Sequence, residues 1–372
     1  MSDAPPQMAN LPEAAELDIS PLVRSMRSVT NSYKHLLLRA ILRGAAASRD
    51  GFLPYHDLFR GMLEEAWWPA FHYRLSLGKQ DRVVSLLERA IPDPDQLRVR
   101  PEDVPELIRS VPFDGKEQRR TGLLRYVPQR LILPWFEAEV RGTGREDQLV
   151  PGLSVERFDT ARPLYAIHDD GLQLHPAWHA HLLKWHSVFM GWSDARWIEF
   201  LESRNPHAIG LLAKIRPAFE RTPLVAQRRI WGEAATIAPF ACIYTGMRID
   251  TAFFALDHFL PHAFVGHDRF WNLCPTAPEI NLQKRDALPD RAFVRHLAEQ
   301  HAGLHAVAAK LSPGARQDLR RVHDEYAVDL GLDGAVLSDA AVLHRAYGES
   351  FDLLRGIAGR MGFPLDWSPT SW

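Results

Sequence analysis

The chain has 372 residues, of which 46% are hydrophobic and 24% are charged, and its formal net charge is −2. This composition is ordinary for a globular protein with a sizeable core, and it excludes a globally basic nucleic-acid binder. Only two cysteines occur, which excludes a disulfide framework and favours a reducing, cytoplasmic compartment. The sequence lacks a signal-peptide pattern and a run of about 18 apolar residues, so we expect neither export nor a membrane span.

The first 95 residues are expected to form a helical N-terminal region (1–95). Apolar residues recur at steps of three and four along residues 21–46, 55–77 and 81–91, which is the spacing of a buried helix face. Pro69 interrupts the second pattern, and proline inside a helix removes a hydrogen bond and clashes with the preceding turn. We therefore predict a kink or a helix boundary at this position.

Residues 96–235 are expected to form a mixed, mainly helical region with basic patches. Between residues 116 and 130, five basic residues accompany a single glutamate, and Tyr126 is interleaved with them. A basic stretch with an aromatic residue can bind a phosphate backbone, and residues 221–229 form a second possible patch. The alternative is a solvated surface beside a structural tyrosine. The candidate phosphate contacts are Arg119, Arg120 and Arg125.

Histidines gather in the second half of this middle region. Residues 164–167 predict a short strand, and residues 178–192 and 195–203 predict two helices. His175 and His179 are spaced as metal ligands on one helix face would be. No carboxylate accompanies them and tryptophans lie close by, so we favour histidines on the helix surface over a metal site.

The C-terminal region, residues 293–372, is predicted to be helical. Periodic apolar residues mark helices over 292–311 and 315–330. A third helix is expected to start after Ser338 and Asp339, since serine and aspartate are preferred caps of helix N-termini. The sequence therefore predicts a mostly α protein with a small α+β insert.

The insert is residues 236–292, and it has the most informative pattern of the chain. Residues 242–246 and 252–256 resemble two short strands, and residues 264–269 resemble a loop. Residues 276–288 are expected to form a helix, with a proline at residue 275 in its first turn. A β-β-α unit of this kind would let Asp257, His258 and Asn281 converge.

These three side chains have the chemistry that phosphodiester hydrolysis needs. The reaction requires an activated water, neutralisation of phosphate charge and help for the leaving alkoxide. His258 can act as a general base, because a neutral imidazole is a competent base near pH 7. Asp257 and Asn281 offer a carboxylate and an amide oxygen, the ligand types that Mg²⁺ or Mn²⁺ takes.

Further polar residues of the same stretch can support this chemistry. Asn272 can hold the loop and the imidazole in place by hydrogen bonds. Lys284 lies one helical turn beyond Asn281 and can contact a phosphate. His262 is a further candidate for a phosphate contact, and the alternative is a loop histidine that faces solvent. The two cysteines, Cys242 and Cys274, are expected to be small buried residues.

With these motifs in view, the stretch resembles the HNH (ββα-metal) endonuclease family, and especially the HNH domain of RNA-guided CRISPR effector nucleases. The motifs that match are Cys-Ile-Tyr-Thr-Gly at 242–246, Asp257-His258 followed by Pro261, a lone Asn272, and Asn281 with Lys284 three residues later. The resemblance implies that Asp257 and Asn281 are metal ligands, that His258 is the general base and that Asn272 orients it. It also implies a ββα-metal nuclease core between the helical regions.

The resemblance implies a metal-dependent endonuclease that nicks or cuts DNA, with bacterial anti-phage defence or restriction as its setting. The helical regions on either side resemble standalone bacterial HNH proteins. Two alternatives stay open: a non-catalytic DNA-binding or assembly subunit, and a latent nuclease that a protein partner or signal activates. One HNH unit cuts one strand, so double-strand cleavage would require a homodimer or successive nicks.

Overall fold

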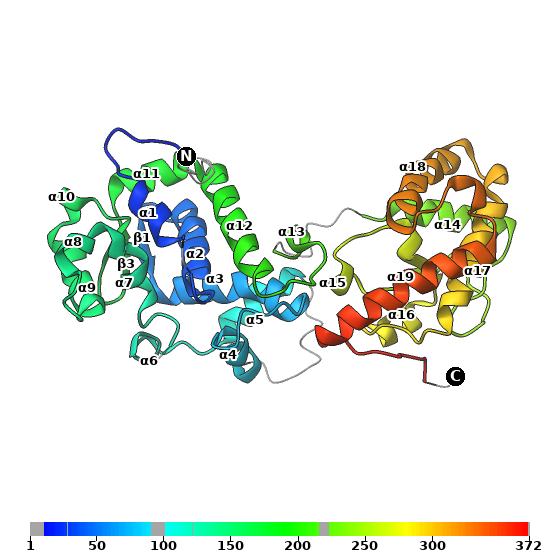
Figure 1. Ribbon diagram of the computed structural model, residues 1–372, viewed down its shortest axis with the longest axis horizontal. Helices are drawn as coiled ribbons and strands as arrows, with labels where there is room; N and C mark the ends of the chain where they lie inside the picture. The colour runs from blue at the N-terminus through cyan, green and yellow to red at the C-terminus, as the bar shows by residue number, and fades with distance from the viewer. Residues whose placement is uncertain (1–10, 28, 91–100, 121, 216–222, 371–372) are drawn as a thin grey trace, which may run out of the picture. The chain divides into compact units, whose positions relative to one another are not determined.

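A computed structural model describes residues 11–27, 29–90, 101–120, 122–215 and 223–370 (Figure 1). The chain divides into two compact units: unit 1 comprises residues 1–206 and 215–219, and unit 2 comprises residues 207–214 and 220–372. Both units are mainly helical and each contains one small antiparallel sheet, which confirms the prediction of a mostly α protein with a small β insert. Within the described ranges, no helix combines the length and the apolar character needed to cross a membrane.

Unit 1 is organised around α2 (Tyr33–Ala47), which packs against α3 (Tyr55–Ala66) and α12 (His186–Glu202). Figure 1 shows α2 inside the unit, between α12 and the small sheet. The apolar face predicted for α2 is buried, and its leucines and Ile41 have almost no exposed surface. The other helices of unit 1 are α1 (Ser20–Ser25), α4 (Val83–Ala90), α5 (Val104–Ser110), α6 (Gly115–Arg120), α7 (Val127–Ile132), α8 (Glu137–Val140), α9 (Glu146–Glu156), α10 (Phe158–Ala161) and α11 (Pro176–Lys184).

A buried arginine joins the three central helices of unit 1. Arg39 of α2 forms ion pairs with Glu65 of α3, at 2.5 Å, and with Asp194 of α12. Arg43, one turn later on α2, pairs with the same Glu65. Removing one partner of a buried ion pair leaves an uncompensated charge, so these contacts specify how the three helices pack.

The sheet of unit 1 has three short antiparallel strands in the order β1–β3–β2. They are β1 (Phe52–Pro54), β2 (Tyr165–Ile167) and β3 (Gly171–Leu174). The sequence predicted only β2. Gly171 permits the close pairing of β3 with β1, because a Cβ atom there would lie 2.5 Å from the carbonyl oxygen of Leu53.

Two helix boundaries differ from the predictions. Residues 21–46 were expected to form one helix, but the chain breaks between α1 and α2, where Ser32 donates its main-chain N–H and its hydroxyl to the carboxylate of Asp81. The two helices predicted at 178–192 and 195–203 are divided at Trp185 instead of at residues 193–194. Pro69 lies in a π-helical segment, Trp67–His72, that continues α3.

The histidines of α11 and α12 make structural hydrogen bonds. The Nε2 atoms of His179 and His186 lie 3.0 and 3.2 Å from the carbonyl oxygens of Ala45 and Leu42, which belong to the last turns of α2. The carbonyl of Ala45 lies in the last turn of α2 and lacks a partner within the helix, so the His179 imidazole satisfies it, whereas His186 adds a second contact to a carbonyl inside the helix. His175 is buried and caps α11, so the expectation of a surface position was wrong for this residue.

Unit 2 contains α14 (Val225–Ile237), α17 (Phe293–Ala306), α18 (Pro313–Leu330) and α19 (Ala340–Arg360), with α17 packed on α19 and α14 on α18 (Figure 1). Buried residues of these helices share one hydrophobic core with a two-stranded sheet. The predicted N-cap of α19 is confirmed, because the Asp339 carboxylate accepts hydrogen bonds from the N–H groups of Ala341 and Val342 in the first turn of the helix. The remaining helices and strands are α13 (Leu211–Lys214), β4 (Ala255–His258), α15 (His262–Val265), β5 (Leu273–Thr276) and α16 (Pro278–Lys284).

His301 of α17 lies at the centre of unit 2 and is fully buried. Its Nδ1 atom lies 2.7 Å from the Tyr326 hydroxyl of α18, and its Nε2 atom lies 3.2 Å from the carbonyl oxygen of Leu273 in β5. Trp231 of α14 packs edge-to-face against the imidazole at 5.0 Å. Burial lowers the pKa of His301 to about 3, so the ring is neutral in the folded protein.

We predict that His301 makes unit 2 sensitive to acid. Its pKa lies near 3 in the folded state and near 6.5 in the unfolded state, so the unfolded chain alone gains a proton between these values. The stability that is present above pH 6.5 should therefore fall by about 1.4 kcal/mol per pH unit as the pH drops towards 3. Urea unfolding of the wild type and of His301→Gln between pH 7 and 4 should show a flatter dependence in the variant. Parallel curves would contradict this role.

Candidate active site

The strands β4 and β5 place an aspartate and a histidine on opposite sides of a two-stranded sheet. They pair antiparallel, with Asp257 opposite Cys274 and His258 opposite Leu273. Neighbouring residues of a strand point to opposite faces. Asp257 accordingly faces the interior and is 3% exposed, whereas the His258 side chain is 13% exposed.

The two strands predicted for the β-β-α segment do not lie where the sequence placed them. Residues 242–246 form a turn, closed by an isolated bridge between Ala241 and Arg248, and the strand predicted at 252–256 starts later, as β4. The second strand is β5, which includes Pro275 instead of leaving it to the helix. Proline is tolerated there because both strands of a two-stranded sheet are edge strands. Pro278 occupies the first turn of α16, where its missing N–H has no cost.

Asp257 is held by two buried partners from other parts of the unit. The Tyr244 hydroxyl donates a hydrogen bond of 2.6 Å to Oδ2, and the Lys284 ammonium lies 3.1 Å from Oδ1. Lys284 also donates to the carbonyl oxygen of His258 at 2.6 Å. Burial, and then the Asp257 charge, raise the pKa of Tyr244 well above its usual value, so the phenol keeps the proton that it donates. One carboxylate thus ties together a turn, β4 and α16.

His258 has a carboxylate partner that the sequence did not reveal. Its Nε2 atom lies 2.7 Å from Oδ1 of Asp268, which follows the short helix α15. The ring of His262, the first residue of α15, packs perpendicular to that of His258 with centroids 5.4 Å apart. Asp268 lies within the predicted loop 264–269, and no spacing rule links it to His258, so only the fold brings the two residues together.

Asn272 is fully buried and holds the chain directly after His258. Its amide oxygen accepts the N–H of Leu260 at 2.7 Å, and its amide nitrogen donates to the carbonyl oxygen of the same residue at 2.8 Å. Its main-chain oxygen also accepts the N–H of Phe259. These bonds fix the loop, as the sequence suggested, and they reach the main chain beyond His258 rather than its ring.

Asn281 and Lys284 lie one turn apart on α16 and have different surroundings. Asn281 is half-buried, and its side-chain amide has no hydrogen-bond partner among the residues that the structure describes. The Lys284 ammonium is buried beside Asp257. The phosphate contacts expected of Lys284 and His262 stay predictions.

Asp257 and Asn281 have the donor chemistry for a hard divalent cation. Each carboxylate oxygen can accept about two hydrogen bonds or metal contacts, so Asp257 keeps acceptor capacity beside Tyr244 and Lys284. The described residues include no group of three or more His, Cys, Asp and Glu side chains suited to hold an ion. A carboxylate and an amide oxygen fit a cation that keeps several waters, as Mg²⁺ does.

The arginines predicted as phosphate contacts belong to unit 1, whereas Asp257 and His258 belong to unit 2. Arg119 donates to the carbonyl oxygen of Asp169 at 2.6 Å, Arg120 lies 3.6 Å from Glu117, and the Arg125 guanidinium lies 4.3 Å from the centre of the Tyr126 ring. In the second basic patch, Arg221 lies outside the described residues, and Arg229 forms an ion pair with Asp318.

Residues 242–290 match the family model described as HNH endonuclease. This segment is an HNH domain. The HNH domain contains the 242–246 turn, β4, β5 and α16, and it indicates that the protein is a nuclease. The narrower resemblance to the HNH domain of RNA-guided nucleases stays a prediction. No curated protein and no solved structure matches the chain.

We predict that Lys284 is required for the stability of the HNH domain. Lys284→Met would leave the buried Asp257 carboxylate without its cation, at a cost of about 3–5 kcal/mol. The double variant with Asp257→Asn should regain part of this loss, because it also removes the uncompensated charge. Asn281→Ala, on the same helix, should change the free energy of unfolding by less than about 0.5 kcal/mol. Urea unfolding checks all three, and equal effects of Lys284→Met and Asn281→Ala would contradict the role of the ion pair.

Proposed function

We propose that the protein is a metal-dependent endonuclease that hydrolyses DNA phosphodiester bonds at the HNH domain. The observation that carries this proposal is the pair of His258 and Asp268, at 2.7 Å, with His258 on the strand that also bears the buried Asp257 carboxylate. An imidazole fixed by a carboxylate is suited to accept a proton from water. His258 belongs to the same β4–β5–α16 segment as the candidate metal ligands Asp257 and Asn281.

His258 would act as the general base through its Nδ1 atom. In a neutral imidazole one nitrogen carries the proton and the other accepts one. When the Nε2–H group donates to Asp268, Nδ1 is the basic nitrogen. The Asp268 carboxylate would then hold the ring in one orientation and stabilise the imidazolium that forms when water loses its proton. Asn272 supports this geometry, because it fixes Leu260, two residues beyond His258.

Asp257 and Asn281 would hold a Mg²⁺ or Mn²⁺ ion on the α16 side of the site. When bound, such an ion neutralises phosphate charge and stabilises the leaving oxygen. Lys284 would orient Asp257 and compensate its charge, since the ammonium lies 3.1 Å from the carboxylate. In this proposal Lys284 acts through Asp257. His262, whose ring packs against that of His258, is the candidate for a phosphate contact.

Several finer features are part of the same proposal. Each HNH domain offers one general base, His258, so one cleavage reaction would nick one strand. Double-strand cleavage would need a second copy of the protein or a second cleavage reaction. Both cysteines are free thiols in the structure, which supports a reducing, cytoplasmic setting. A role in anti-phage defence, and activation by a protein partner, are predictions that rest on the resemblance alone.

The proposal predicts metal-dependent nicking of supercoiled plasmid DNA that is lost in His258→Ala. Removal of a general base lowers a rate by about 10²–10⁴-fold. Asp268→Asn should cause a smaller loss, because the ring keeps a hydrogen-bonding neighbour but loses the charge that stabilises the imidazolium. The matched control is Asp324→Asn, an exposed aspartate of α18, which should nick at the wild-type rate. Circular dichroism and urea unfolding check that each variant is folded.

The same assay separates the proposal from its alternatives. Cleavage that survives in a folded His258→Ala variant would contradict the assigned base. Tight DNA binding without cleavage, with Mg²⁺ or Mn²⁺ at several pH values, would instead favour a non-catalytic DNA-binding subunit. Cleavage that appears only when a protein partner is added would favour a latent nuclease.

A further inference from the structure

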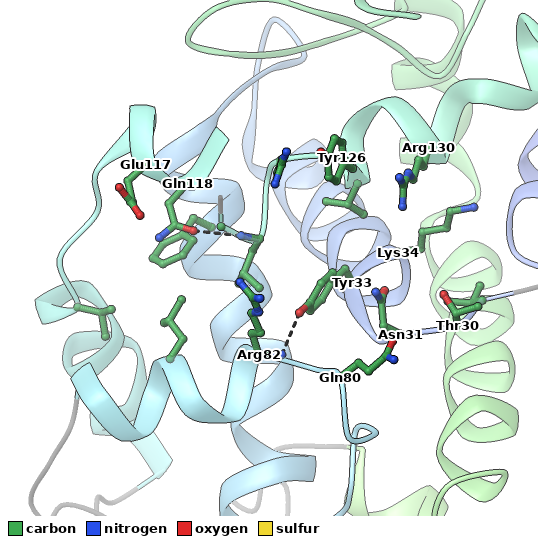
Figure 2. Close-up of a pocket in the computed structure, with 18 of the residues that line it drawn as sticks. Thr30, Asn31, Tyr33, Lys34, Gln80, Arg82, Glu117, Gln118, Tyr126 and Arg130 are labelled. Atoms are coloured by element: carbon green, nitrogen blue, oxygen red, sulfur yellow. Dashed lines mark hydrogen bonds between the residues drawn. The ribbon is translucent and has the colours of Figure 1, made fainter. Parts of the chain in front are cut away.

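Unit 1 contains a concave pocket of about 810 Å³ that the nuclease chemistry does not use. Small-molecule sites commonly occupy about 300–1,000 Å³. The described lining comes from three stretches far apart in the sequence, residues 29–34, 80–89 and 111–130, and from Phe59 of α3 (Figure 2). Three buried apolar residues of the 111–130 stretch, Val111, Leu123 and Val127, contribute to the lining together with Phe59 of α3.

The charged lining of this pocket is predominantly cationic. Only one carboxylate, that of Glu117, is among the described lining residues. Apart from Arg130, which pairs with Asp147 at 2.9 Å, the cationic side chains have no ion-pair partner among the residues that the structure describes. Cations gathered in a cleft raise the local potential and attract anions. The cationic lining residues are Lys34, Arg82, Arg89, Arg125 and Arg130.

Lys34 is the strongest indication that the pocket is built for an anion. Its ammonium is half-buried and donates to the carbonyl oxygen of Ser25 at 3.1 Å. Burial, and then the neighbouring Arg130 cation, lower the pKa of Lys34. Two cations held near each other favour an anion between them, and a phosphate group accepts hydrogen bonds from both.

The rest of the lining suits a flat, polar ring. Figure 2 shows Tyr33 in the middle of the pocket, with Lys34 and Arg130 towards one end and Glu117 and Gln118 towards the other. The Tyr33 hydroxyl accepts a hydrogen bond from the N–H of Arg82, which fixes the ring in the lining. Aromatic rings stack favourably on one another, and the amide and carboxylate at the far end can recognise the polar edge of a ring.

We propose that this pocket binds a nucleotide, with its phosphate at the Lys34–Arg130 end and its base along Tyr33 towards Gln118. A concave site with a partly apolar lining suits a small molecule better than the backbone of a DNA duplex, which a protein contacts over an extended surface. The proposal concerns unit 1 alone and does not depend on the chemistry of the HNH domain.

Isothermal titration calorimetry of the full-length protein tests this proposal without divalent metal. The probes are ATP, GTP, CTP and UTP, with pyrophosphate, adenosine and a 20-base-pair DNA duplex as comparisons. At least one nucleotide should bind at least tenfold more tightly than pyrophosphate and adenosine. Lys34→Gln and Arg125→Gln should each weaken that binding at least tenfold. Arg141→Gln, an exposed arginine outside the pocket, should leave it unchanged.

Three results would overturn the proposal. One is no nucleotide binding at 1 mM ligand, and another is pyrophosphate binding as tight as that of every nucleotide, which would mean a bare anion site. The third is binding of the duplex alone, weakened by the same two variants, which would make the pocket part of a DNA surface. Lys34 has no carboxylate partner among the described residues, so Lys34→Gln should fold. Arg125 is exposed and gives an independent second test.

Discussion

The HNH domain depends on Asp257, a buried carboxylate that contacts segments far apart in the sequence. Tyr244 reaches one of its oxygens from the 242–246 turn, and Lys284 reaches the other from the end of α16. A carboxylate and an ammonium both lose hydration when they are buried, and this loss is offset only when the pair is close and further hydrogen bonds are made. The additional bond from Lys284 to the carbonyl of His258 meets that condition. These contacts therefore favour one packing arrangement of the turn, β4 and α16.

This arrangement places the proposed metal ligand, Asp257, and the proposed general base, His258, on opposite faces of β4. Asp257 faces the interior with Lys284, so its charge is compensated and its position is fixed. His258 faces the other side, where Asp268 supplies a second and independent carboxylate. Asn272 supports both residues, because its side chain is bonded to the main chain of Leu260, which directly follows the Asp257–His258 pair and Phe259. In the proposed mechanism, a rigid carboxylate and an oriented imidazole are thus obtained from two consecutive residues of one short strand.

The sequence supplied the candidate residues of the site, whose roles stay predictions, but it misplaced the strands that position them. Asp257, His258, Asn272 and Asn281 were recognised by residue type and spacing, because a motif preserves both. The strands were misplaced, since three or four residues contain too few alternations to define a strand and Pro275 resembled a helix start. Asp268 was missed because its contact with His258 depends on the path of a loop, which no local pattern encodes.

The pocket of unit 1 illustrates the same limit. The basic stretch of residues 116–130 was visible in the sequence, but Lys34 and Arg82 approach it from two other segments. Of the predicted phosphate contacts, Arg125 lines the pocket, whereas Arg119 is bonded to Asp169. Charge patterns along a chain therefore indicate that a basic surface exists, but the fold decides which cations share it.

Plasmid nicking by the Asn281→Ala variant tests the central claim most directly. Asn281 has no side-chain hydrogen bond among the described residues, so its loss should leave the fold intact and remove only the proposed metal ligand. The account predicts that wild-type protein nicks supercoiled DNA with Mg²⁺ or Mn²⁺, and that the folded variant loses this activity across a titration of either metal. Nicking by Asn281→Ala at the wild-type rate and with the same metal dependence would contradict the account.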